Sequence, residues 1–97
     1  MQLVTSEELE QMKANGDKIL VDFYASWCGP CKTLASIIER NPPSIPVVEI
    51  DIDEDIQMAM NHKIRGVPTL ILMQDGEEIR RKSGVLSSSE LNKFIGL

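Results

Sequence analysis

Residues 21–32 read VDFYASWCGPCK, and this segment indicates both the fold class and the chemistry of the chain. The apolar and aromatic run at residues 18–24 is typical of a buried central strand. Cys28 and Cys31 follow it, with Pro30 placed where the first turn of a helix tolerates proline. The segment therefore predicts a strand that leads through a short loop into a helix, with both cysteines at the N-terminus of that helix.

The position of Cys28 predicts a reactive thiol. At the first turn of a helix, unpaired backbone N–H groups and the positive end of the helix dipole stabilise a thiolate. Cys31 lies three residues later, nearly one turn on, so that its sulfur can reach that of Cys28. Gly29 and Pro30 limit the conformational freedom of the resulting ring or relieve its strain. We therefore expect Cys28 to be the nucleophile and the pair to form a reversible disulfide.

Two other interpretations of the cysteine pair are a half zinc site and inert buried thiols. A closed zinc site needs four ligands, and His62 is the only other cysteine or histidine in the chain, so we expect no metal site. The Gly-Pro pair in a strand-to-helix turn argues against inert thiols. His62 itself is expected to be a surface residue of a later helix.

The flanking sequence predicts an alternation of helices and strands. Spacing of apolar residues, capping boxes at Thr5 and Ser87, and the Asp75-Gly76 hairpin signal define these elements. Crossover helices make the first strands parallel, whereas the hairpin is antiparallel. The predicted fold is α/β, with a central mixed sheet flanked by helices on both faces. The expected elements are helices at 5–15, 30–41, 56–64 and 87–95 and strands at 18–24, 45–52, 69–74 and 77–82, with room for a short strand near Leu3.

Length and composition set limits on function. The chain has 97 residues, 42% hydrophobic and 26% charged, which predicts one small globular domain at residues 1–97. Its net charge of −5 argues against direct nucleic-acid binding. No apolar run is long enough to cross a membrane, and acidic residues stand near the N-terminus where a secretory signal has positive charge. We therefore expect a cytoplasmic protein.

Two segments and one glycine resemble the thioredoxin family. Residues 21–32 resemble its active-site segment, residues 64–70 (IRGVPTL) are similar to its cis-proline segment, and Gly84 falls where the family keeps a glycine. The resemblance covers nearly the whole chain. It implies the thioredoxin fold and a protein-disulfide reductase that works by dithiol–disulfide exchange.

The resemblance also assigns roles and partners. Cys28 would attack a target disulfide, Cys31 would release the reduced target, and Asp22 would relay a proton. Burial in an apolar strand should raise the pKa of Asp22, although pairing with a buried lysine or with water is an alternative. No tightly bound cofactor is implied beyond the Cys28–Cys31 disulfide. Electrons would come from NADPH through a flavoprotein thioredoxin reductase, and a monomer is expected.

A docking surface for target peptides is implied as well. Pro68 would be the cis-proline of the family, whereas the sequence alone favours the commoner trans form. Trp27 is expected on this surface, with burial in the core as its alternative. The surface would consist of Trp27, Gly66, Val67, Pro68, Gly84 and Val85.

Three positions depart from the family pattern. Glu49 stands where many thioredoxins have a lysine beside the buried aspartate, which places like charges near each other. Ser36 replaces a proline that often kinks the second helix, and the link at residues 41–45 is short. Two other functions remain open: a redox-independent binding module, and an oxidase or isomerase. The Gly-Pro pair between the cysteines is similar to that of reducing members.

Overall fold

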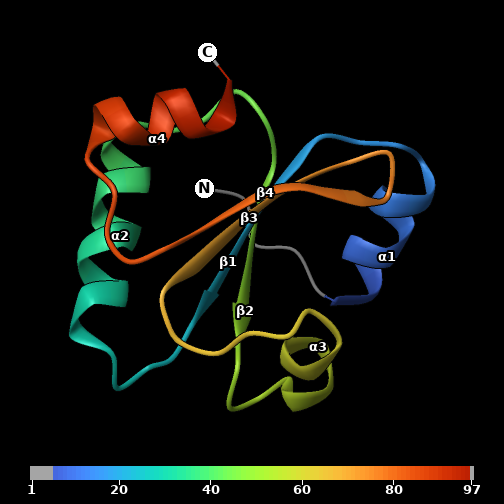
Figure 1. The fold of residues 1–97 in the computed structure, drawn as a ribbon, viewed down its shortest axis with the longest axis horizontal. Helices are drawn as coiled ribbons and strands as arrows, with labels where there is room; N and C mark the ends of the chain where they lie inside the picture. The colour runs from blue at the N-terminus through green and yellow to red at the C-terminus, as the bar shows by residue number, and fades with distance from the viewer. Residues whose placement is uncertain (1–5, 97) are drawn as a thin grey trace.

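The computed structural model describes residues 6–96 of the chain. Helices and strands alternate along these residues up to the closing β-hairpin, which a last helix follows, as the sequence predicts (Figure 1). Their bounds agree with the predicted ranges to within a few residues, and the expected short strand near Leu3 lies outside the described residues. The elements are α1 (Ser6–Ala14), β1 (Ile19–Tyr24), α2 (Gly29–Arg40), β2 (Val47–Asp51), α3 (Ile56–Asn61), β3 (Thr69–Gln74), β4 (Glu77–Ser83) and α4 (Ser88–Ile95).

The described strands form one mixed sheet in the order β2-β1-β3-β4. β1 pairs in parallel with β2 and antiparallel with β3, and β3 pairs antiparallel with β4. At the hairpin, Asp75 and Gly76 have φ values of 55° and 78°, as a two-residue type I′ turn requires. The mixed sheet predicted from the crossover helix and the hairpin is confirmed. It places the C-terminal end of β1, which leads to the cysteines, between β2 and β3.

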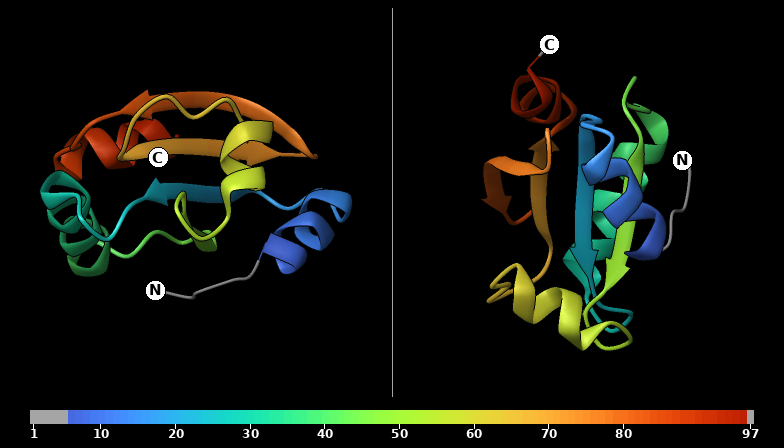
Figure 2. Two further views of the ribbon diagram at one scale, coloured as in Figure 1. Left: turned by 90° about the horizontal axis from the view of Figure 1, so that it is seen from below. Right: turned by 90° about the vertical axis from the view of Figure 1, so that its right-hand side faces the viewer.

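Helices cover both faces of the sheet (Figures 1 and 2). On one face, Val21 and Phe23 of β1 pack with Leu9 of α1 and Met58 of α3. On the other face, Leu20 packs with residues of α2 and α4. Because side chains alternate along a strand, Asp22 shares the face of Leu20 and is directed toward the α2 side.

The third helix is shorter than predicted. It ends at Asn61, and Lys63 adopts a left-handed conformation with a φ of 54°. The N–H of Lys63 donates to the carbonyl of Met60, and the N–H of Ile64 donates to that of Ala59, both at 3.0 Å. These two bonds form a Schellman motif, which ends a helix. Ile64 has helical spacing but lies beyond the end of α3, where it packs against the core.

Helix α4 begins with the predicted capping box, which provides a stability test. Ser87 Oγ accepts from the N–H of Glu90, and the N–H of Ser87 donates to Glu90 Oε1, both at 3.1 Å. Replacing Ser87 by alanine leaves one helix N–H without this acceptor. We expect a loss of about 1 kcal/mol in the free energy of unfolding, measured by urea titration. Ser88→Ala, the same change one residue later, is the control, and an equal loss in both variants would contradict this role of the Ser87 hydroxyl.

Candidate active site

Cys28 and Cys31 form a disulfide at the N-terminus of α2. Cys28 is the N-cap residue, Pro30 lies in the first turn, and the two Cα atoms are 5.3 Å apart. The backbone N–H of Cys31 donates to Cys28 Sγ at 3.1 Å. Cys28 Sγ therefore occupies the place that a serine or aspartate oxygen takes in an ordinary helix cap, next to the positive end of the helix dipole.

Burial hardly distinguishes the two cysteines. Cys28 is 5% exposed and Cys31 is 3% exposed, and both pack with Ala25 in one small cluster. Val67, from the segment before β3, also packs against this cluster. The helix cap, rather than exposure, is what separates Cys28 from Cys31.

Asp22 is buried beneath this end of α2. The residue is 1% exposed, and its Oδ1 has no hydrogen-bond partner among the described residues. No ion pair between residues 6 and 96 involves Asp22, so this part of the chain contains no buried lysine that compensates the carboxylate. Burial, and then the negative charge of Glu49, raise the pKa of Asp22 from 3.8 to about 7. The raised pKa expected from the sequence is confirmed.

Glu49 is the direct neighbour of Asp22 on the adjacent parallel strand. Residues paired in this way have side chains on the same face of a sheet. Both line a hollow of about 250 Å³ that Cys31 and Lys32 also line. Burial, and then the charge of Glu39, raise the pKa of Glu49. The expected like-charge pair is therefore present, and it lies beside the buried side of the disulfide.

The segment at residues 66–68 lies next to the disulfide from the other side. The Val67–Pro68 peptide bond is cis, as the family resemblance implies and the sequence alone did not favour. The N–H of Gly84 donates to the carbonyl of Pro68 at 2.9 Å, and Gly84 has a φ of 91°, a conformation that favours glycine. Gly84 thus holds the start of β3 against the end of β4.

Trp27 is on the surface and not in the core. Its side chain is 70% exposed, and its indole Nε1 donates to Asp53 Oδ2 at 2.8 Å. Val85 is also exposed, at 41%. The sequence shows Asp53 only as one member of an acidic run, and no local signal pairs it with Trp27.

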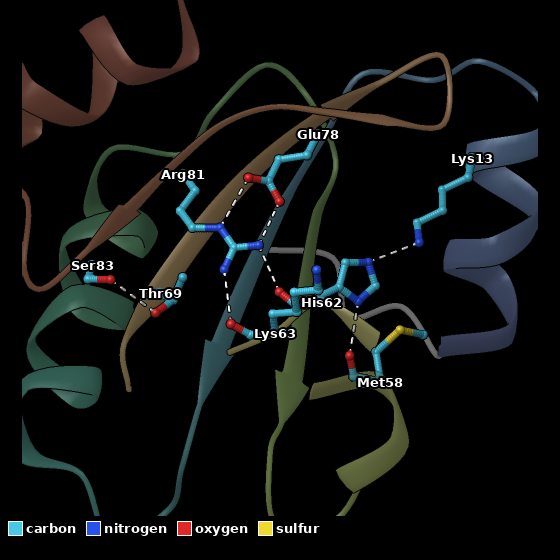
Figure 3. Close-up of polar contacts among 8 residues, drawn as sticks. All are labelled: Lys13, Met58, His62, Lys63, Thr69, Glu78, Arg81 and Ser83. Atoms are coloured by element: carbon cyan, nitrogen blue, oxygen red, sulfur yellow. Dashed lines mark hydrogen bonds and ion pairs between the residues drawn. The ribbon is translucent and has the colours of Figure 1, made fainter. Parts of the chain in front are cut away.

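The prediction that His62 is a plain surface residue of a helix is wrong. His62 is half-buried at the end of α3, and its ring contacts that of Phe23, with 5.4 Å between centroids and an angle of 46° between the ring planes. Its Nε2 lies 3.1 Å from Lys13 Nζ, and its Nδ1 lies 3.0 Å from the carbonyl of Met58 (Figure 3). The ring therefore connects α1 with α3, a long-range contact that spacing along the chain does not reveal.

A disulfide between cysteines three residues apart at a strand-to-helix junction, beside a buried carboxyl, is typical of thiol–disulfide oxidoreductases. Comparison with known proteins places the chain within that class. The thioredoxin family model matches residues 1–96, so the chain belongs to the thioredoxin family. Its family, its cysteine pair and its fold make it a dithiol–disulfide oxidoreductase.

Individual relatives agree with this assignment. The chain is 34% identical to a thioredoxin of Mycoplasmoides gallisepticum over 96% of each chain. It is 36% identical to a thioredoxin of Chlamydia trachomatis, covering 98% of this chain and 95% of the relative. Among solved structures, a single-site mutant of a thioredoxin from Halobacterium salinarum superposes with a TM-score of 0.85 at 36% identity, covering 96% of this chain and 85% of that one. The thioredoxin fold is thus confirmed over nearly the whole chain.

No helix among residues 6–96 has the length and apolar character needed to span a bilayer.

Proposed function

We propose that the chain reduces disulfide bonds of other proteins, with Cys28 as the nucleophile and Cys31 as the resolving thiol. The observation that supports this order most directly is the position of Cys28 Sγ at the N-cap of α2, where it accepts the N–H of Cys31. In the reduced protein the same N–H group and the helix dipole favour the Cys28 thiolate. Cys31 lies inside the first turn and has no comparable cap position.

The exchange proceeds in two steps. The Cys28 thiolate attacks one sulfur of the target disulfide, a bond forms between Cys28 and the target, and the other target sulfur leaves as a thiolate that takes up a proton. Cys31 then loses its proton and attacks Cys28 Sγ, so that the Cys28–Cys31 disulfide forms and the second target sulfur leaves. Two electrons pass from the protein dithiol to the target. The protein ends in the oxidised form that the structure has.

Asp22 is the proposed acceptor of the Cys31 proton. It lines the same hollow as Cys31, and its pKa of about 7 keeps part of the molecules ionised near neutral pH. A base works best when its pKa lies near the working pH. Burial of Asp22 is therefore compatible with a role in the second step.

Target peptides are proposed to bind across the surface beside the disulfide. The exposed indole of Trp27, the exposed side chain of Val85 and the open space above Gly66 support this proposal. Backbone groups at residues 66–68 would then pair with an extended segment of the target. The proposed docking residues are Trp27, Gly66, Val67, Pro68, Gly84 and Val85, with Gly29 and Pro30 shaping the cysteine turn.

Electrons are proposed to reach the protein from NADPH through a flavoprotein thioredoxin reductase, in the cytoplasm. Members of the family act without a tightly bound cofactor, and the redox disulfide is present in this chain. The Gly-Pro pair between the cysteines supports the direction of a reductant rather than an oxidase. A reduction potential as high as that of secretory-pathway catalysts, measured against a glutathione buffer, would contradict this direction.

Reduction of insulin disulfides tests the chemistry and its electron source in one series. We expect turbidity from insulin precipitation with dithiothreitol as donor, and again with a thioredoxin reductase and NADPH. The Cys28→Ser/Cys31→Ser double variant should be inactive in both. Failure with dithiothreitol would reject the reductase, whereas failure only with the enzymatic donor would reject the proposed electron source.

The exposed Trp27 also suits a binding module that does not use redox chemistry. The same double variant separates the two functions in a cell that depends on this protein. If the double variant loses insulin reduction and also fails to support growth of that cell, the reductase is supported. If the double variant still supports growth, the binding module is supported.

A further inference from the structure

A basic hollow lies next to the docking residues 66–68. It has a volume of about 380 Å³, and its lining includes three cationic side chains and no acidic one among the described residues. This positive lining contrasts with the net charge of −5 of the whole chain. The lining residues are Lys63, Arg65, Gly66, Thr69, Arg81 and Ser83, and we call this hollow the basic hollow.

The three cationic side chains of the basic hollow differ in their contacts. Arg81 is held by hydrogen bonds and an ion pair, whereas Lys63 and Arg65 form no ion pair among the described residues. Arg81 reaches from β4 to the backbone carbonyls of His62, at 2.7 Å, and Lys63, at 3.3 Å, and it forms an ion pair with Glu78 at 2.7 Å (Figure 3). Its charge is thus balanced, and it fixes the loop that precedes residues 66–68. Among residues 6–96, neither of the two ion pairs includes Lys63 or Arg65.

The floor of the hollow is fixed by further contacts. Thr69 Oγ1 donates to the carbonyl of Gly66 at 2.7 Å, which ties the start of β3 to the segment before it. The same oxygen lies 3.4 Å from Ser83 Oγ at the end of β4 (Figure 3). A site that is held in place before binding loses less conformational freedom when a ligand arrives. The unpaired charges of Lys63 and Arg65 are therefore presented on a fixed backbone.

The charges around the disulfide differ between its two sides. Because β1 lies between β2 and β3, the acidic residues that follow β2 and the basic hollow before β3 lie on opposite sides of the end of β1. Asp53, on the β2 side, holds the indole of Trp27. A segment that crosses from Trp27 to Gly66 therefore meets negative charge at one end and positive charge at the other.

We propose that the basic hollow binds an acidic side chain of the target segment, so that the protein prefers disulfides with a glutamate or aspartate on one flank of the attacked cysteine. This inference rests on the proposed reductase function, since it assigns a substrate preference to the same site. Charge complementarity of this kind affects specificity and the rate of association more than it affects total affinity. It applies to one flank only, because Asp53 repels an acidic residue on the other.

Cyclic peptide disulfides provide the probe. In the first pair of peptides, the residue before the attacked cysteine is glutamate in one peptide and glutamine in the other. In the second pair, the residue after that cysteine differs in the same way. Binding to the oxidised protein is followed by NMR through the amides of Lys63 and Gly66, and reduction by kcat/KM. In one placement we expect glutamate to be favoured about three- to tenfold at low ionic strength, since exposed ion pairs are individually weak. High salt should abolish the preference.

Two variants with matched chemistry locate the effect. Lys63→Gln/Arg65→Gln should bring the ratio of glutamate to glutamine peptide close to one. Arg40→Gln, at the opposite end of the 12-residue α2 from Cys28, should leave the ratio unchanged. A ratio near one for both placements in the wild type, or a ratio that survives the double substitution, would overturn the proposal.

The two readouts keep this inference separate from the proposed function. Binding to the oxidised protein needs no turnover, so its ratio decides the inference even if no peptide is reduced. Reduction of the glutamine peptides tests the reductase alone. Normal reduction without any charge preference removes the inference and leaves the reductase in place.

Discussion

Replacing Cys28 by serine should reduce insulin reduction to the uncatalysed level, whereas replacing Cys31 by serine should trap the protein in a mixed disulfide with its target. A serine hydroxyl at the N-cap of α2 can accept the N–H of residue 31 but cannot attack a disulfide as a thiolate does. In Cys31→Ser, the first step proceeds and the resolving sulfur is missing. Mass spectrometry of the protein after incubation with an oxidised target measures the trapped species.

Folding controls are needed because both variants lose the disulfide. Thermal unfolding of each variant should be compared with the reduced wild type and not with the oxidised one. Release of fully reduced target by Cys31→Ser would contradict the role of Cys31 as the resolving thiol. A mixed disulfide that accumulates on Cys31 in the Cys28→Ser variant, at the rate seen for the opposite variant, would contradict the role of Cys28 as the preferred nucleophile.

Asp22→Asn should stabilise the oxidised protein increasingly as the pH rises. The folded protein keeps the Asp22 proton up to pH about 7, whereas the unfolded chain loses it near pH 3.8. Between these values the folded state binds more protons, so raising the pH lowers the free energy of unfolding of the wild type. The effect is absent below pH 3.8 and complete above about pH 7. At about 1.4 kcal/mol for each pH unit, the asparagine variant should gain about 4 kcal/mol relative to the wild type across this interval.

Urea unfolding of both oxidised proteins at pH 4 and pH 8 measures the difference. Asp17→Asn is a suitable control because it makes the same chemical change at an exposed position just before β1. If the difference in free energy of unfolding between wild type and Asp22→Asn were the same at pH 4 and pH 8, Asp22 would titrate as an ordinary exposed carboxyl.

Glu49→Gln separates the two causes of the Asp22 shift. It removes the like charge and leaves Asp22 buried, so the titration midpoint of Asp22 should fall but stay above 3.8. Glu49→Lys adds an opposite charge and should lower the midpoint further. Carboxyl NMR of the oxidised protein reports both values, and an unchanged midpoint in both variants would leave burial as the sole cause.

Local signals predicted most elements of this chain. The capping box at Ser87, the Asp75-Gly76 turn and the proline at the start of α2 act through bonds within a few residues, so the sequence contains all that they need. The end of α3 was mispredicted because Ile64 has helical spacing, although it lies beyond a left-handed Lys63. Glycine usually occupies the left-handed position that ends a helix, and the lysine found here gives no local sign that α3 ends.

The cysteine pair and its helix cap could be predicted for the same reason, since Cys28, Cys31 and Pro30 are neighbours in the chain. Family resemblance, and not spacing, indicated that Glu49 lies beside Asp22 and that Pro68 is cis. Nothing in the sequence indicated the contact of Trp27 with Asp53, the tilted ring contact of His62 with Phe23, or the hydrogen bonds of Arg81 to the loop before residues 66–68. These contacts join residues far apart in the chain, and they form because the order of strands in the sheet brings the ends of β1, β2 and β4 close to the start of β3.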